Sequence, residues 1–584
     1  MKFLCALCVL CGSSFFAAGL EREAFTITKY DLEVRLDPDQ QRLGARGKVT
    51  LRNESGQPQK IATLQISSSL NWRAIQVDGK PVQYVSQPYT SDIDHTGALS
   101  EAIITLPAEI KPKDSVELEI GYEGVIPLDT TRLTRVGVPP DIARHSSWDQ
   151  ISPAFTAVRG AGYVAWYPIT TESADFSEGN SLFEVVDRWK AREAGSDFKL
   201  VLSLEGGSAE GALTLLCGAD AQGSSAGVGK ERRLQVECSW NPLATVTPAF
   251  AMAAYVDESK APLKLFSLPG HEAGAAAYSS ALDPATKFVT GWFGPPSAPI
   301  AIADFADPNS APFESGTLLM ASMAKEDSKL AGINLVHELV HSTLPSSRPW
   351  VYEGLAHFAE AMYRQQQGGR EAALDLLGLH RAAFLDSEKE VSASLQKGLV
   401  EKGVEKGAEP RNMGQPLATT FDETYYRSKA AYVWCMLRDM VGDDALKQAI
   451  RQYRAADDNN KDSKYVEHLI EAAAKRDLGW FFDDWVYQDR GLPDLRVQSV
   501  HPWKTEKDVQ FITVTLENLG MAGAEVPFTI MFEGGEITKR MEVRARSTAT
   551  TRVELEGVPN QIVINDGSVP ESDLTNNVFV IPAP

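Results

Sequence analysis

The sequence predicts a multidomain α+β protein, in which a β-rich N-terminal domain, a helix-rich central domain and a C-terminal β-sandwich follow one another. Two observations support this prediction. Apolar residues alternate with polar ones in both end regions, as in β-strands, and recur at helical spacing in the central region. At 584 residues the chain is also too long for one hydrophobic core, because domains average about 150 residues.

The first 19 residues have the pattern of a cleaved secretory signal peptide. Lys2 precedes an apolar run, and the small residues Ala17 and Gly19 follow it. The apolar run is shorter than the ~20 residues that a membrane-spanning helix needs. We therefore expect an exported protein, periplasmic or secreted, without a stable membrane span.

Residues 20–256 are predicted to form the β-rich domain. Segments such as "FTITKYDLEVRLD", "SVELEIGYEG" and "RLQVECSW" alternate apolar and polar residues between turns rich in Gly, Pro and Asn. Cys217 and Cys238 lie in neighbouring strand-like segments of this region. In an oxidising compartment they could form a disulfide, and two buried free thiols are the alternative.

Residues 257–493 carry the helical pattern, in segments such as "GINLVHELVH", "EGLAHFAEAMYRQQ" and "YRSKAAYVWCMLRDMVG". From residue 494 to residue 584 the alternation returns, in "VQFITVTLEN", "VPFTIMFEG" and "TRVELEG". Several short strands of this kind in about 90 residues predict a small β-sandwich.

The formal net charge of the chain is −21, from 57 basic and 78 acidic side chains. A surface with this charge repels a polyphosphate backbone, and no stretch of the sequence is dense in Lys and Arg. The composition therefore argues against nucleic acid as a partner.

The pentapeptide "HELVH" is the main signal of chemistry in the sequence. His337 and His341 are four residues apart, so on a helix both imidazoles project from one face and can bind one Zn²⁺ ion. Glu338 stands beside them, where a carboxylate can take a proton from zinc-bound water, whose pKa the metal lowers to roughly 7. The alternative is a helix with two surface histidines. The pattern predicts one zinc ion per chain.

The segment "WVYEGLAHFAE", residues 350–360, resembles the second zinc helix of the gluzincin peptidases, in particular the M1 aminopeptidase family. There a W-x-x-E-G-x-A pattern carries the third zinc ligand, and a second glutamate follows seven residues later. The resemblance implies that Glu353 is the third ligand and that Glu360 orients a ligand histidine. Counting residues from His341, as in the M1 family, gives Glu360 as the ligand instead, so the reverse assignment stays open.

Two further segments are similar to M1 motifs. "APFESG" resembles the G-x-M-E-N loop, which implies that Glu314 binds the free α-amine of a substrate. "YYRSKAAYVW" resembles the helix that opens with Y-x-K-G-A, which implies that Tyr426 donates a hydrogen bond to the oxyanion. Tyr426 lies three residues before Lys429 where the family has two, so Tyr425 is an alternative donor.

The resemblance implies a thermolysin-like catalytic domain and a zinc metallopeptidase, most simply an aminopeptidase that releases N-terminal residues from peptides or proteins. We expect a monomer. A zinc endopeptidase or oligopeptidase with an open cleft would share every metal residue and differ at Glu314. A catalytically inactive binding or scaffold protein on the same fold is the alternative from another class.

Overall fold

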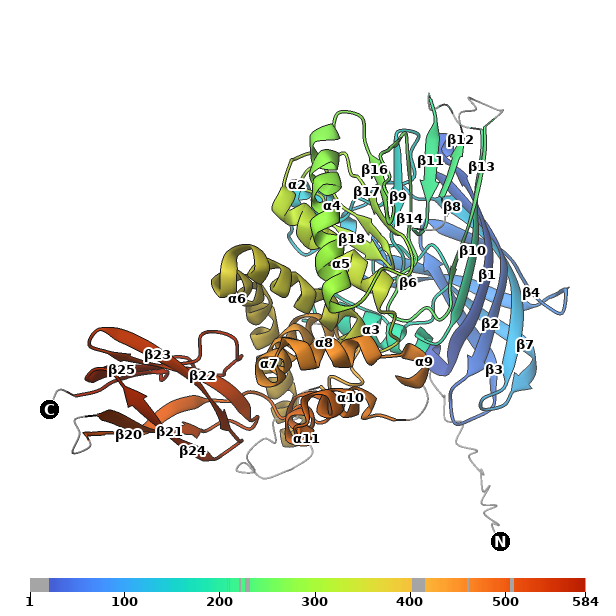
Figure 1. Ribbon diagram of the computed structural model, residues 1–584. Helices are drawn as coiled ribbons and strands as arrows, with labels where there is room; N and C mark the ends of the chain where they lie inside the picture. Colours follow the sequence, from blue (N-terminus) through green and yellow to red (C-terminus); the bar gives the residue numbers. More distant parts are fainter. Residues whose placement is uncertain are drawn as a thin grey trace, which may run out of the picture.

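The protein is described by a computed structural model (Figure 1). The predicted signal peptide, residues 1–19, lies outside the described residues. The predicted multidomain α+β architecture is confirmed, because sheets lie at both ends of the chain and helices dominate the middle. The structure describes residues 20–179, 181–206, 208, 211–219, 222–225, 232–401, 415–458, 462–504 and 509–582.

The N-terminal region is built from packed β-sheets. In the main sheet the strand order is β13-β10-β1-β2-β8-β4-β5, and smaller sheets have the orders β3-β7-β6 and β12-β11-β14-β9. Alternate residues of β1 are buried, so one face of this strand faces the core, as the sequence pattern predicts. The strands are β1 (Phe25–Asp37), β2 (Arg42–Asn53), β3 (Gln59–Ser67), β4 (Leu70–Val77), β5 (Lys80–Pro81), β6 (Gln83–Thr90), β7 (Ala98–Ile110), β8 (Ser115–Val125), β9 (Phe155–Val158), β10 (Asp197–Glu205), β11 (Leu213–Leu216), β12 (Gln222–Ser225), β13 (Arg233–Trp240) and β14 (Phe250–Ala253).

Short helices and a disulfide complete the N-terminal region. Cys217, just after β11, is bonded to Cys238 on β13, with 6.1 Å between their Cα atoms. The bond joins the main sheet to a smaller one and decides between the two alternatives that the sequence leaves open. The helices are α1 (Thr131–Arg135), α2 (Pro140–Ser146) and α3 (Ser181–Glu193).

The central region packs helices beside a sheet with the order β15-β16-β17-β19-β18. Strands β16, β17 and β19 are parallel, and β18 is an antiparallel strand beside β19. The strands are β15 (Val256–Asp257), β16 (Leu263–Ser267), β17 (Ile300–Ala303), β18 (Phe313–Ser315) and β19 (Leu318–Met320). The helices are α4 (Glu272–Trp292), α5 (Ser328–Thr343), α6 (Pro349–Glu401), the π-helical turn η4 (Thr424–Lys429), α7 (Ala430–Val441), α8 (Asp443–Gln452), α9 (Ala455–Asp458), α10 (Tyr465–Ala474), α11 (Gly479–Phe482) and the π-helical turn η5 (Asp483–Tyr487).

The C-terminal region is a β-sandwich at the far end of the molecule from the N-terminal sheets (Figure 1). One sheet has the order β20-β21-β24 and the other the order β23-β22-β25-β26. Apolar residues of both sheets share one core with the central helices, and the Trp485 indole donates a hydrogen bond to the Gly523 carbonyl (2.8 Å). The strands are β20 (Leu495–Lys504), β21 (Gln510–Asn518), β22 (Ala524–Phe532), β23 (Gly535–Val543), β24 (Thr548–Leu555), β25 (Pro559–Ile564) and β26 (Val578–Val580).

No helix in the described part of the chain combines the length and the hydropathy that crossing a membrane requires.

Candidate metal centre and active site

Helix α5 carries both histidines of "HELVH". The Asp327 side chain caps its first turn by accepting hydrogen bonds from the backbone N–H groups of Lys329 and Leu330 (3.1 and 3.0 Å). The apolar residues around the histidines are buried in the core of the domain. With that face fixed, His337 and His341 project side by side, and their Nε2 atoms lie 2.9 Å apart.

Helix α6 brings Glu353 to the histidine pair. Its carboxylate oxygens lie 3.8 Å from Nε2 of His337 and 3.8 Å from Nε2 of His341. The next residue, Gly354, has no room for a side chain, because a Cβ atom there would lie 2.6 Å from the Cβ of Ala430 on α7. Gly354 thus allows α6 and α7 to pack closely beside the site.

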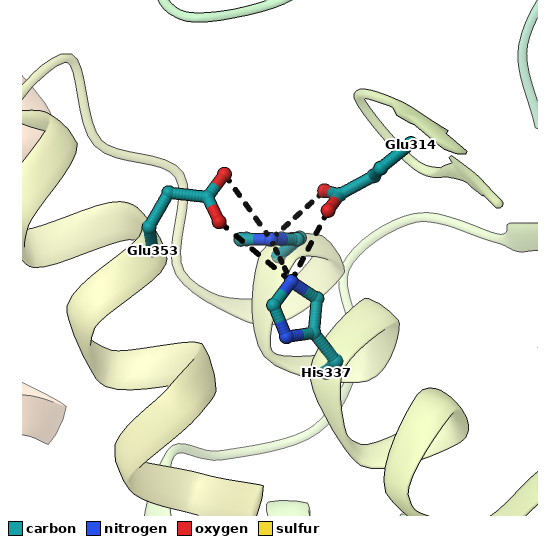
Figure 2. A group of neighbouring side chains, drawn as sticks. Glu314, His337 and Glu353 are labelled. Atoms are coloured by element: carbon teal, nitrogen blue, oxygen red, sulfur yellow. Dashed lines mark hydrogen bonds and ion pairs between the residues drawn. The ribbon is translucent and has the colours of Figure 1, made fainter. Parts of the chain in front are cut away.

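Strand β18 adds a second carboxylate to the group. The Glu314 oxygens lie 3.2 Å from Nε2 of His337 and 3.0 Å from Nε2 of His341. Figure 2 shows Glu314 and Glu353 approaching the His337 ring from opposite sides, one from a strand and the other from a helix. Sequence reasoning assigned Glu314 to the substrate, and the structure places it in direct contact with the histidines.

These residues fit a zinc ion. One ligand atom from each of Glu314, His337, His341 and Glu353 lies within 4.8 Å of all the others, so the group could hold a metal ion. Imidazole nitrogens and carboxylate oxygens are ligands that Zn²⁺ prefers, and its bonds to them are about 2 Å long.

Glu360 lies on the other side of His337. Its Oε1 atom is 2.7 Å from Nδ1 of His337, whereas the metal group gathers at Nε2 of the same ring. The two nitrogens of an imidazole point away from each other, so Glu360 does not share a metal position with His341. Burial opposes ionisation of Glu360, but His357 and the hydrogen bond from His337 together lower the pKa of this carboxyl well below its usual value.

Glu338 is buried at the wall of a cavity. Its side chain is 1% exposed, and neither of its oxygens has a hydrogen-bond partner among the residues that the structure describes. It lines a cavity of about 310 Å³ that also exposes His337 and Glu353. Burial and then the negative charge of Glu314 raise the pKa of Glu338 well above its usual value, and a bound cation would oppose this shift.

The N-terminal region holds the segment that carries Glu314. The backbone N–H of Ala311 donates to the His145 carbonyl (3.0 Å), and the Trp148 indole donates to the Ala311 carbonyl (3.1 Å). On the other side of Glu314, the Ser315 hydroxyl donates to the carbonyl of Thr247 (2.9 Å). The position of Glu314 therefore depends on contacts between two regions of the chain.

The two candidate tyrosines differ in their surroundings. Tyr426 lines the cavity, whereas the Tyr425 ring is buried against Phe384, with 6.2 Å between ring centroids. Both belong to the π-helical turn η4, which holds one more residue per turn than an α-helix. Burial raises the pKa of the Tyr426 phenol, so the side chain is a protonated donor at neutral pH.

The structure adds residues around the cavity that the sequence did not indicate. Of these, His357 had a recognisable signal, because it precedes Glu360 by three residues on α6 and so shares its face. Three others carry no motif of their own. Lys190 lies on the distant helix α3, and Tyr352, just before Glu353, stacks on His341 with ring centroids 3.7 Å apart. The third is Arg427, whose Nε lies 3.3 Å from Oε2 of Glu353.

Solved structures resemble this chain at low sequence identity. An M1 zinc metallopeptidase from Deinococcus radiodurans is 14% identical, with a TM-score of 0.44, over 81% of this chain and 96% of that protein. Aminopeptidase A of Legionella pneumophila, solved in complex with aspartic acid, is 11% identical with a TM-score of 0.55, over 94% of this chain. The match spans 59% of the Legionella protein.

No protein-family profile matches the sequence, and no curated protein sequence matches it either. At 11% identity, the similarity to the Legionella aminopeptidase establishes the fold. It extends over nearly the whole chain, including both β-rich regions and the helical domain between them. The resemblance seen in the sequence is thus confirmed at the level of the fold, and the protein has an M1-like fold.

Proposed function

We propose that the protein is a zinc-dependent metallopeptidase that releases N-terminal residues from peptides. One observation carries the proposal. His337, His341 and Glu353 bring their ligand atoms together, and two of them, His337 and Glu353, line a cavity. Glu338 lines the same cavity, and its carboxyl group has no hydrogen-bond partner among the described residues. A histidine pair, a third ligand and an adjacent base are what metal-assisted hydrolysis of a peptide bond requires.

Each residue has a role in this proposal. Bound at the group, a zinc ion would polarise the substrate carbonyl and lower the pKa of a water molecule. Glu338 takes a proton from the attacking water and later delivers it to the leaving amine. Tyr426 donates a hydrogen bond to the carbonyl oxygen as negative charge develops there. Glu360 keeps His337 in one orientation, with its Nε2 toward the metal group.

Glu314 is the proposed partner of the substrate's α-ammonium group. Its carboxylate faces the histidine pair at the cavity, so an ammonium bound there would hold the first peptide bond close to Glu338. The 3.0–3.2 Å contacts with the histidines also allow a second role, in which Glu314 is itself a metal ligand. In that role it would not be free to bind an amine, which would favour a zinc endopeptidase.

One experiment separates these functions. Purified protein with a measured zinc content is incubated with a set of peptides in free and N-acetylated forms, and the products are identified by mass spectrometry. Stepwise loss of N-terminal residues from free peptides, at least about tenfold faster than any cut in blocked ones, supports the aminopeptidase. Equally fast internal cuts in both sets identify an endopeptidase. Zinc binding without any hydrolysis would identify a binding or scaffold protein.

We also propose that the protein is exported and acts as a monomer. The Cys217–Cys238 disulfide supports export, because such bonds persist in oxidising compartments. Fractionation of cells with an antibody tests the compartment, and light scattering of the purified chain tests the oligomeric state.

A further inference from the structure

Helix α3 of the N-terminal region brings a buried cation to the active-site cavity. Lys190 is 8% exposed and lines the cavity together with Tyr426. Its Nζ atom lies 3.3 Å from the Tyr426 hydroxyl oxygen, although the two residues are 236 positions apart in the chain. The contact joins the β-rich region to the turn that carries the proposed oxyanion donor.

The chemistry of the two groups determines the direction of this hydrogen bond. An ammonium group has three donors and no acceptor, so Lys190 must donate and the phenol oxygen must accept. The hydroxyl proton of Tyr426 is therefore not used in this bond and is available to another acceptor. A substrate oxygen in the cavity is such an acceptor.

Other charged groups line the cavity near Lys190. Burial lowers the pKa of the Lys190 ammonium, whereas the Tyr426 phenol and the carboxylate of Glu423, just before η4, raise it, and Arg427 opposes them. Burial raises the pKa of Asp187, one turn earlier on α3, to about 8. Lys190 in turn opposes the effect of burial on the pKa of Tyr426. The ammonium thus shares the cavity wall with these carboxyl groups and with the phenol.

We infer that Lys190 is a positioning residue for the hydrolysis proposed above, and that it directs the O–H of Tyr426 toward the substrate carbonyl. This inference depends on the proposed function, in which Tyr426 stabilises the oxyanion. It also gives the N-terminal region a part in the reaction, because α3 supplies the residue that orients a donor located on the helical domain.

Kinetics of a double-mutant cycle test the inference. Lys190→Met keeps an unbranched side chain, one heavy atom shorter, and removes the donor, and we expect kcat to fall about 10- to 100-fold with little change in KM. Lys190→Arg keeps a donor-only cation and should recover part of the loss. In a Tyr426→Phe background, Lys190→Met should change kcat less than threefold, because the hydroxyl through which it acts is already gone.

A matched control and a second readout separate positioning from structural damage. Arg188→Met removes a cation from an exposed position of the same helix, where Arg188 pairs with Glu23, and should leave kcat unchanged. In the second readout, fluorotyrosine is placed at position 426 and its phenol is titrated by ¹⁹F NMR. Replacing Lys190 with methionine should raise the measured pKa of this phenol, because a nearby positive charge favours its ionised form.

The outcomes are distinct. An equal loss of kcat in the wild-type and Tyr426→Phe backgrounds, or an unchanged ¹⁹F titration in Lys190→Met, would overturn the positioning role. A wild-type protein that binds zinc but cleaves no peptide would instead overturn the proposed function. The ¹⁹F titration needs no turnover, so it still decides whether Lys190 acts on Tyr426.

Discussion

Replacing Glu353 and Glu360 by alanine, one at a time, separates a metal ligand from a carboxylate that supports one. The structure places Glu353 at the Nε2 side of His337, 3.8 Å from that atom, and Glu360 at the Nδ1 side, 2.7 Å away. Both side chains are almost fully buried, and both contact the same imidazole. The two variants should nevertheless lose zinc to very different extents.

The size of each effect follows from the contacts that are lost. Structural zinc sites with four ligands bind with about 10–16 kcal/mol, so one ligand contributes about 3 kcal/mol. Glu353→Ala also leaves Arg427, 3.3 Å from the missing carboxylate, facing the cation, which adds about 1 kcal/mol of repulsion. Together these losses weaken zinc binding on the order of a thousandfold. Glu360→Ala removes one hydrogen bond to a ligand, which typically weakens binding about 10- to 100-fold.

The assay is a competition titration of each metal-free protein against a zinc chelator of known affinity, which yields Kd directly. Glu326→Ala is a matched control, because it removes one carboxylate at an exposed position just before α5 and should leave Kd unchanged. If Glu360→Ala loses more affinity than Glu353→Ala, the assignment of the two glutamates is reversed and the residue count from His341 is the better guide.

Three further perturbations test the site and the fold. Glu338→Gln should keep the zinc and lower kcat by at least about a hundredfold, because it removes the base without changing the shape of the side chain; near-normal turnover would exclude this role. Glu314→Ala should slow cleavage of free peptides at least about tenfold and spare blocked ones if it binds the α-ammonium, whereas a large loss of zinc affinity in the same variant would make it a ligand. Burial raises the pKa of the Glu193 carboxyl, whose ordinary value is 4.5, to about 7. Between these values the unfolded chain releases a proton that the folded chain keeps, so stability falls as the pH rises, by up to about 3 kcal/mol. Glu193→Gln should therefore show a smaller decrease in Tm from pH 5 to pH 8 than the wild type, and equal decreases would contradict the assignment.

Local patterns predicted the parts of the site that one helix determines. Residues four apart on a helix share a face whatever the rest of the chain does, so "HELVH" alone placed His337 beside His341. The alternation of apolar residues similarly predicted strands such as β1, because a strand with one buried face has a period of two. The glycine of the Glu353–Gly354 pair reflects packing, because α7 leaves no room for a side chain at Gly354.

Contacts between distant segments were decided by the tertiary structure. The sequence left the pairing of Cys217 with Cys238 open, because neither the register nor the relative position of two sheets follows from the strand patterns. The sequence also left Tyr425 and Tyr426 open as oxyanion donors, and only the tertiary structure shows that Tyr426 lines the cavity while Tyr425 packs against Phe384.

The sequence by itself determined the α+β architecture, the histidine pair and the position of Glu338 beside it, because each depends on residues within a few turns of one another. Only the tertiary structure decided that Glu314 contacts both histidines and that Lys190 reaches the hydroxyl of Tyr426. The physical reason is that these side chains lie on separate elements, in part from different domains. Their distances are set by how whole domains pack, and no local spacing in the chain encodes them.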